Sequence, residues 1–315
     1  MKITVLDAAT LGKDVTFDKW QAFGELDLHQ TTPADEVINR LKNSDVAILN
    51  KTKITKEVLT ALPRLRLICV TATGYDNIDT VACKKRGVAV CNVKGYSTHS
   101  VAQVTLSLVL ALITHLPEYS QSVKSGDYTA SGIANKLTPV FHELYGKTFG
   151  VVGLGNIGKQ VARVAEAFGC RVLCFKRTPD PDYNCVDLNT LLRESDVVTL
   201  HLPLTDETFN IIDKNALSLM KKSAILVNAA RGAVTNEQDV ANALKDGVIG
   251  GFATDVYSLE PLQIDSPLQQ IKDMPNVILT PHMAWGAYES RVRCIDEIAM
   301  NIDAFLKGEK RNRVD

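Results

Sequence analysis

Continuous apolar segments rich in β-branched residues alternate with helical segments through most of this chain. The apolar segments do not alternate apolar and polar residues, which is typical of strands buried on both faces of a parallel sheet. Strands separated by helices predict an α/β fold, in which helices cover such a sheet. The segments fall into two sets, 3–6, 45–50, 65–74 and 88–92, then 149–155, 171–175, 196–203, 224–232, 250–256 and 277–282. The sequence therefore predicts two doubly wound parallel-sheet lobes.

The order of these segments also predicts how the domains are divided. A chain of 315 residues exceeds what one hydrophobic core commonly supports, so two domains are expected. Residues 288–306 carry apolar side chains at helical spacing, and Gly308 is the expected end of that helix. A helix that follows the completed second sheet should pack back on the first lobe. We therefore predict a discontinuous domain of residues 1–97 and 285–315, with residues 98–284 inserted as a second domain.

Charge and cysteine usage narrow the choice of partners and compartment. Lys and Arg number 35 against 36 for Asp and Glu, so no global field favours nucleic acid or an anionic membrane. The seven cysteines are odd in number and form no Cys-x-x-Cys, which indicates buried thiols in a reducing compartment. The N-terminus reads as a strand rather than a signal peptide, and residues 101–116 are too short and polar to span a bilayer. We expect a cytoplasmic protein and predict no metal site.

A glycine-rich turn opens the second set of strands. Residues 153–158 read Gly-Leu-Gly-Asn-Ile-Gly, with an apolar strand before them and a helical pattern after them. In a dinucleotide-binding fold, Gly153, Gly155 and Gly158 allow the tight turn, the approach of a pyrophosphate and close helix–strand packing. Backbone N–H groups near Asn156 and Ile157, at the helix N-terminus, then bind the phosphates. The alternative is a tight turn between strand and helix that binds nothing.

Basic residues stand where such a fold usually places an acid. Lys176 lies 18 residues after Gly158 and is followed by Arg177 and Thr178. An acid there accepts hydrogen bonds from the adenosine ribose and repels a 2′-phosphate, whereas cations and a hydroxyl suit that phosphate. The cofactor is therefore expected to be NAD(P)H, with a modest preference for NADP(H). The alternative is that these side chains point into water and NAD(H) binds through its hydroxyl groups.

Reduction of a 2-keto acid needs a cation for the carboxylate, a proton donor and a group that keeps the donor protonated. Arg231, Glu260 and His282 follow strands of the second set, and ligands bind beyond the carboxyl ends of strands in open α/β sheets. A guanidinium can bind a carboxylate through two parallel hydrogen bonds, and a carboxylate can stabilise an imidazolium. His201, also at a strand end, is a rival for His282. Each of these residues could instead be a structural polar group in a loop.

Several motifs together are similar to one protein family over nearly the whole chain. The sequence resembles the D-isomer-specific 2-hydroxyacid dehydrogenases, and glycerate dehydrogenases or hydroxypyruvate reductases among them. The resemblance rests on TATGYDNID (71–79), NVKGYSTHSVAQ (92–103), GKTFGVVGLGNIG (146–158), SDVVTLHLPLTDET (195–208), NAARG (228–232), DVYSLEPL (255–262) and TPHMAWGAYESR (280–291). It implies a Rossmann-type dinucleotide-binding domain inserted in a flavodoxin-like substrate domain.

The resemblance also implies roles for individual residues. Arg231, Glu260 and His282 would form the catalytic set, with His282 as the acid and base. The turn at Thr73, Gly74 and Tyr75 would bind the substrate carboxylate, and Trp285 would line the substrate pocket. Asp255 would hold the nicotinamide carboxamide. The remaining residues implied to border the cofactor are Leu202, Pro203, Thr208 and Ala229.

Activity and assembly follow from the same resemblance. The expected reaction is NAD(P)H-dependent reduction of hydroxypyruvate or glyoxylate to D-glycerate or glycolate. One alternative is a dehydrogenase for a bulkier 2-keto acid, and another is a dinucleotide-sensing binding module like the corepressors of this fold family. Such enzymes are typically homodimers built through the cofactor domain. The apolar helix 98–116 is the candidate interface element.

Overall fold

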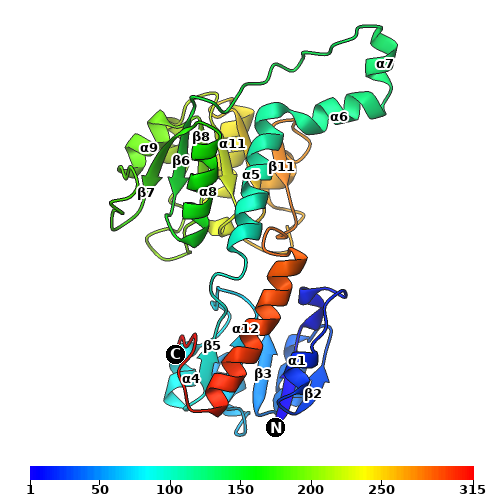
Figure 1. Ribbon diagram of the computed structural model, residues 1–315, viewed down its shortest axis with the longest axis vertical. Coiled ribbons are helices and arrows are strands. Elements are labelled where there is room, and N and C mark those ends of the chain that lie inside the picture. The colour runs from blue at the N-terminus through cyan, green and yellow to red at the C-terminus, as the bar shows by residue number, and fades with distance from the viewer. The chain divides into compact units, whose positions relative to one another are not determined.

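The computed structural model describes residues 1–315, which form two compact units. One unit consists of Met1–Ser97 together with Gly286–Asp315, and the other is the continuous stretch Thr98–Trp285. Each unit contains one all-parallel sheet covered by helices, as Figure 1 shows. The predicted fold of two parallel α/β lobes is therefore confirmed. Trp285, which we expected in the discontinuous unit, is the last residue of the continuous one.

The sheet of the discontinuous unit has the strand order β2-β1-β3-β4-β5, which is the flavodoxin-like order. Its strands are β1 (Lys2–Val5), β2 (Glu25–Leu28), β3 (Val46–Leu49), β4 (Leu67–Val70) and β5 (Ala89–Cys91). All four residues of β3 and of β4 are buried, as continuous apolar strands in the centre of a covered sheet should be.

The edge strand β2 was not predicted. Its sequence ELDL alternates charged and apolar residues, and none of its four residues is fully buried. It pairs in parallel with β1 on one side only. A half-exposed edge strand lacks the continuous apolar pattern that identified the other strands, and charge on such an edge protects it from pairing with other chains.

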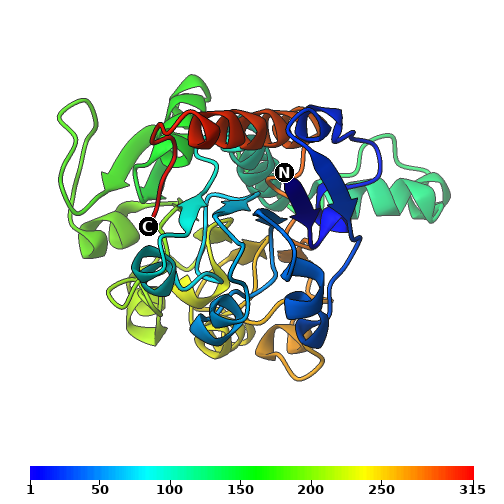
Figure 2. The same cartoon turned by 90° about the horizontal axis from the view of Figure 1, so that it is seen from below.

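The C-terminal helix α12 (Tyr288–Leu306) belongs to the discontinuous unit and has the predicted bounds. The indole Nε1 of Trp20, in α1 (Asp18–Gln21), donates to the Ile295 carbonyl of α12 at 3.0 Å, and both helices lie side by side in Figure 2. Gly308, the expected stop, lies two residues after the last helical residue Leu306 and has a left-handed φ of 76°. The other helical segments of this unit are η1 (Ala8–Leu11), η2 (Ala34–Glu36), α2 (Val37–Leu41), α3 (Lys56–Thr60) and α4 (Thr80–Lys85).

The sheet of the continuous unit has the order β11-β10-β9-β8-β6-β7. Its strands are β6 (Thr148–Val152), β7 (Arg171–Phe175), β8 (Val197–Leu200), β9 (Ile225–Asn228), β10 (Gly251–Thr254) and β11 (Val277–Leu279). Beyond β7, a single parallel bridge between Cys174 and Cys185 stands where a Rossmann sheet has its third strand. The chain order reverses between β6 and β8, so ligands are expected beyond the carboxyl ends of these two strands.

Helices cover both faces of this second sheet. On one face, α5 (Thr98–Thr114) and α8 (Asn156–Ala167) share a buried apolar cluster with β6 (Figure 1). On the other face, a separate cluster includes side chains of α9 (Leu188–Glu194), α10 (Lys214–Leu219) and α11 (Glu237–Lys245). The short segments η3 (Gly232–Val234) and η4 (Pro267–Gln270) complete the unit.

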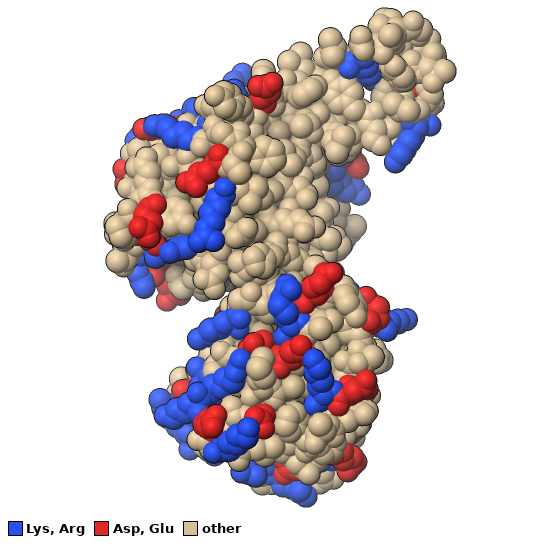
Figure 3. Space-filling model, viewed as in Figure 1, with Lys and Arg blue, Asp and Glu red and all other residues tan.

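The helix predicted over residues 98–116 ends two residues early. His115 takes a left-handed φ of 51°, and a separate helix α6 (Leu116–Lys124) follows, then α7 (Asp127–Ser131), both projecting from the unit in Figure 1. No single helix is long and apolar enough to cross a membrane; only α5 with α6 would pass, as a pair bent by 65°, on length and composition. On the face in Figure 3, Lys and Arg lie among Asp and Glu.

Candidate active site

The three glycines of the turn after β6 each meet a different steric demand. Gly153 has φ +100°, and a Cβ there would lie 2.7 Å from the His201 carbonyl carbon. A Cβ at Gly158 would lie 2.1 Å from the Gly153 carbonyl oxygen, so α8 packs directly on the turn. A Cβ at Gly155 would meet nothing within 4 Å, so the backbone is open there. These are the demands of a turn that a dinucleotide pyrophosphate approaches closely.

The N-terminus of α8 lies at this turn and is free of side-chain caps. Gly155 is the N-cap residue, and no side chain accepts from the first N–H groups, those of Asn156 and Ile157 included. The first helical turn therefore presents backbone donors and the positive end of the helix dipole. The residues present fit the pyrophosphate of a dinucleotide.

The segment after β7 carries the predicted cations and also an acid. Lys176 lies 3.6 Å from the Asp180 carboxylate, and Lys159 of α8 lies 2.8 Å from the same oxygen. The Arg177 side chain is 89% exposed and lies 3.9 Å from Glu207. Lys159 and Asp180 were not predicted from the sequence, because an ion pair between residues 21 positions apart has no signature in spacing.

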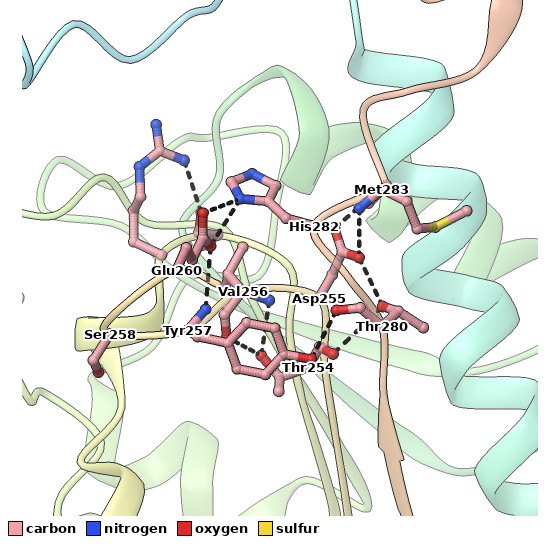
Figure 4. A network of polar contacts seen from close by, with 12 residues as sticks. Thr254, Asp255, Val256, Tyr257, Ser258, Glu260, Thr280, His282 and Met283 are labelled. Carbon is pink, nitrogen blue, oxygen red and sulfur yellow. Dashed lines mark hydrogen bonds and ion pairs between the residues drawn. The ribbon is translucent and has the colours of Figure 1, made fainter. Parts of the chain in front are cut away.

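The His282 imidazole and the Glu260 carboxylate form a close pair, seen at the centre of Figure 4. The Nδ1 atom lies 2.8 Å from Oε1 and 2.7 Å from Oε2 of Glu260. Both side chains are 26% exposed, so the pair is accessible but partly shielded from water. Because an ionised carboxylate only accepts hydrogen bonds, Nδ1 donates and Nε2 is left for another partner.

A buried carboxylate fixes the loop that carries His282. The side chain of Asp255, at the end of β10, is 1% exposed and accepts from the Thr280 hydroxyl at 2.7 Å. It also accepts from the backbone N–H group of Met283 at 2.9 Å, seen in Figure 4, and from that of Ala284 at 2.8 Å. These contacts lie on both sides of His282, whose φ of 52° is uncommon for a residue with a side chain. The expected contact of Asp255 with the nicotinamide stays a prediction.

Tyr257 connects the loop of Glu260 to the loop of His282. Its hydroxyl donates to the Thr280 carbonyl at 2.8 Å, and its backbone N–H donates to Glu260 Oε1 at 3.3 Å. Burial raises the pKa of the Tyr257 phenol to about 12, so it stays a donor. The positioning role of Tyr257 was not predicted, because no motif in the sequence singles this tyrosine out.

Arg231 lies in a turn shaped by the buried Asn228 at the end of β9. The Asn228 amide donates to the Arg231 carbonyl at 2.9 Å, and its Oδ1 accepts from the Ala230 N–H at 3.0 Å. The turn packs tightly against the loop that leads to Glu260, because a Cβ at Gly232 would lie 1.9 Å from the Tyr257 carbonyl carbon. Arg231 and Glu260 are thus carried by adjoining loops of one unit.

The rival histidine, His201, is placed differently. Its Nε2 lies 3.1 Å from the Thr199 hydroxyl, and its Nδ1 is buried without a partner although the residue as a whole is partly exposed. Burial lowers the pKa of His201 to about 3, so this ring is neutral near neutral pH and lacks the second proton that an imidazolium acid donates. His282 therefore stays the predicted proton donor.

The other predicted site residues lie in loops at strand ends. After β8, the Thr208 hydroxyl donates to the Pro203 carbonyl at 2.6 Å and closes the segment that begins at Leu202. Ala229 follows β9 directly, and Trp285 ends the continuous unit. In the discontinuous unit, the turn of Thr73, Gly74 and Tyr75 follows β4, and the Thr73 hydroxyl donates to the Val93 carbonyl at 2.8 Å. No group of His, Cys, Asp and Glu is arranged to hold a metal ion.

Comparisons with known proteins show the family to which this chain belongs. A family model described as the NAD binding domain of D-isomer specific 2-hydroxyacid dehydrogenases matches residues 106–284. A glycerate dehydrogenase of Methylorubrum extorquens is 37% identical over 315 residues, covering 100% of this chain and 99% of that protein. This chain belongs to the D-isomer-specific 2-hydroxyacid dehydrogenases. A hydroxypyruvate reductase of Blautia hydrogenotrophica is 36% identical and covers 100% of the chain and 99% of its own length.

Solved structures of related dehydrogenases and reductases share the whole fold. An acyclic imino acid reductase in complex with NADPH and D-Arg is 31% identical, with a TM-score of 0.90 over 100% of both chains. A D-lactate dehydrogenase of Aquifex aeolicus complexed with NAD and lactic acid is also 31% identical, with a TM-score of 0.85 over 98% of this chain and 96% of that one. The continuous unit of this 2-hydroxyacid dehydrogenase is therefore a Rossmann domain for a nicotinamide dinucleotide.

Proposed function

We propose that this dehydrogenase reduces hydroxypyruvate or glyoxylate to D-glycerate or glycolate. The observation that carries the proposal is the His282–Glu260 pair, 2.7 Å apart, in the same unit as the glycine turn. A proton donor with its own counter-ion is what reduction of a ketone to an alcohol requires of the protein. The names of the relatives, a glycerate dehydrogenase and a hydroxypyruvate reductase, support the choice of substrate.

The proposed chemistry divides among three side chains. The reduced nicotinamide, when bound, supplies a hydride to the ketone carbon. His282 donates the proton of Nε2 to the ketone oxygen, because Nδ1 is engaged by Glu260. Glu260 stabilises the charged imidazolium before transfer and fixes the direction of the ring. Arg231 holds the substrate carboxylate and polarises the ketone, for which a planar guanidinium is suited.

We propose that the enzyme has a modest preference for NADPH over NADH and accepts both cofactors. Lys176 is 38% exposed at the end of β7, where the adenosine ribose of a dinucleotide is expected. A 2′-phosphate there would gain charge-assisted contacts, each of which contributes about 1.5–3 kcal/mol. One structural relative holds NADPH and another holds NAD, so the fold serves both.

The roles of the remaining predicted residues follow the family resemblance. The amides of the turn at Thr73, Gly74 and Tyr75 would bind the substrate carboxylate, and Trp285 would limit the size of the substrate side chain. A dehydrogenase for a bulkier 2-keto acid and a dinucleotide-sensing binding module are the two alternatives. The first alternative differs from the proposal in the size of the substrate, and the second differs in having no turnover.

One experiment separates these possibilities: kcat/KM for glyoxylate, hydroxypyruvate, pyruvate and phenylpyruvate, each with NADPH and with NADH. We expect hydroxypyruvate or glyoxylate to exceed phenylpyruvate by at least about tenfold. A preference for phenylpyruvate would indicate the bulkier substrate class. Dinucleotide binding without turnover of any keto acid would indicate a binding module.

A homodimer is the proposed assembly; the expected interface element, helix 98–116, stays a prediction, and the segment after α5 exposes more apolar surface. Eight residues of α5 are buried, and most of them pack in the core of the continuous unit, so α5 itself has little apolar surface left. Large apolar side chains are instead exposed after it. They are Leu116, Val123, Ile133, Leu137, Val140, Phe141 and Tyr145, between 49% and 77% exposed. Exposed apolar surface of this extent indicates an interaction site, and a second copy is the proposed occupant.

A further inference from the structure

A carboxylate in the segment between β7 and Cys185 contacts two lysines, Lys176 of the same segment and Lys159 of α8. Asp180 is 11% exposed in its side chain, and its Oδ2 lies 2.8 Å from the Lys159 ammonium and 3.6 Å from the Lys176 ammonium. The hydrogen bond from Lys159 lowers the pKa of Asp180, so the carboxylate is ionised at neutral pH. Arg177, by contrast, points into solvent, with 89% of its side chain exposed.

Backbone contacts hold Asp180 in this position. Its N–H donates to the Cys185 sulfur at 3.4 Å, and its carbonyl accepts from the Tyr183 N–H at 3.1 Å. The Lys159 ammonium also lies 5.5 Å from the centre of the Tyr183 ring, a cation–π distance. The carboxylate is therefore part of a folded loop rather than a chance contact between surface side chains.

The place of this cluster in the fold connects it to the cofactor. Lys159 directly follows Gly158, the last glycine of the turn, and Lys176 directly follows β7. A Rossmann fold binds the 2′ position of the adenosine ribose at the end of its second strand, which is β7 here. The two lysines thus lie at the edge of the sheet where a 2′-phosphate would need cations, and both are already paired with Asp180.

We propose that Asp180 sets the cofactor preference, as the counter-ion that competes with the 2′-phosphate of NADPH for Lys159 and Lys176. The inference rests on the proposed function only in taking the dinucleotide to bind at the glycine turn. A phosphate monoester carries about −1.5 to −2 charges at pH 7, so Asp180 repels it and occupies its cations. The 2′-hydroxyl of NADH carries no charge and is not penalised in this way. Asp180 therefore keeps the preference for NADPH modest.

The test is the affinity of the protein for 2′,5′-ADP and for 5′-ADP, measured by calorimetry at low salt in the absence of keto acid. Asp180→Asn removes the competing charge and keeps the size of the side chain. We expect 2′,5′-ADP to bind about five- to tenfold tighter to the variant, with less than a twofold change for 5′-ADP; a factor of ten corresponds to about 1.4 kcal/mol.

Two further variants show whether the effect is local. Asp182→Asn makes the same change in net charge at an exposed neighbour, so a similar gain there would mean a general charge effect and overturn the inference. Asp180→Asn combined with Lys159→Gln should lose most of the gain, because a cation that the phosphate recruits is then absent.

The outcomes separate this inference from the proposed activity. An unchanged or weaker affinity of Asp180→Asn for 2′,5′-ADP contradicts the role of Asp180 whichever keto acid is reduced. If neither nucleotide binds the unaltered protein, the dinucleotide site at the glycine turn is itself wrong. Tight nucleotide binding without any reductase activity would overturn the proposed reaction and leave the role of Asp180 standing.

Discussion

At the scale of single residues, the site depends on two carboxylates with different tasks. Glu260 is partly exposed and contacts the imidazole of His282, whereas Asp255 is 1% exposed and holds the loop on both sides of that histidine. The sequence identified both acids, but it did not show that one contacts the imidazole and the other holds the loop. The order of strands predicted that Glu260 and His282 lie at one edge of a sheet, and their contact needed coordinates. The choice between His282 and His201 also depended on burial, which motif spacing does not encode.

His201 makes the stability of the protein depend on pH. Burial lowers its pKa to about 3, whereas a histidine in the unfolded chain has a pKa near 6.5. Between these values the unfolded state binds more protons, so the free energy of unfolding falls as pH drops below about 6.5. The loss is about 1.4 kcal/mol per pH unit, and it is complete below about pH 3.

His201→Asn should therefore flatten the acid side of the stability profile. Between pH 7 and pH 5, the unfolding free energy of the variant is expected to fall by about 2 kcal/mol less than that of the unaltered protein. Urea unfolding at the two pH values measures this difference, and a constant loss from the missing Thr199 contact cancels in the comparison. Parallel profiles for both proteins would show that the burial of His201 does not govern its protonation.

At the scale of secondary structure elements, steric contacts explain why the glycine turn could be recognised and β2 could not. The turn has a fixed spacing of glycines because the Gly153 and Gly158 positions leave no room for a side chain. Its sequence therefore carries the structural requirement directly. β2 has no such requirement: it is a four-residue edge strand held by backbone pairing to β1, which many sequences satisfy. The loop at Asp180 was missed for a related reason, since its ion pairs join α8 to the segment after β7.

Alanine at two glycines of the turn should separate stability from cofactor binding. In Gly158→Ala the new Cβ would lie 2.1 Å from the Gly153 carbonyl oxygen, so α8 must move and the protein loses about 1–3 kcal/mol of unfolding free energy. In Gly155→Ala the Cβ meets no protein atom within 4 Å, so Tm is expected to stay the same.

Both variants should bind NADPH at least about tenfold more weakly. Gly155→Ala fills the space that the pyrophosphate needs, and Gly158→Ala moves α8, whose N-terminus lies at the turn. Thermal unfolding and fluorescence titration with NADPH give the two quantities. Normal NADPH affinity in Gly155→Ala would mean that the pyrophosphate does not approach this residue.

At the scale of the whole molecule, the path of the chain was more predictable than its assembly. The apolar spacing of residues 288–306 predicted the bounds of α12. Because the strands of the second sheet are complete before this helix begins, the helix was expected to pack on the first lobe, and it belongs to that unit. The predicted interface element, helix 98–116, stays a prediction, because an apolar helix can also be apolar for the core of its own unit, as α5 is. Exposure, rather than composition, is the reason why the segment after α5 is the proposed surface for a second copy.

Charged side chains on that segment should prevent the proposed dimer. Leu137 and Val140 are 74% and 68% exposed, so aspartate at both positions costs the monomer little and places unpaired charges in an apolar interface. Sedimentation velocity should show a dimer for the unaltered protein and a monomer for Leu137→Asp with Val140→Asp. Val81→Asp, at a valine that is 64% exposed on the other unit, is the matched control and should stay dimeric. A dimeric double variant would assign the interface to another surface.

The most direct test of the central claim is the turnover number of His282→Ala in NADPH-dependent reduction of hydroxypyruvate, followed at 340 nm. A positioned proton donor contributes roughly 10²–10⁴-fold to such a rate, so kcat should fall by at least about 100-fold while NADPH affinity changes less than about twofold. His99→Ala, at an exposed histidine outside the site, should keep normal turnover. A kcat for His282→Ala close to that of the unaltered enzyme would contradict the account.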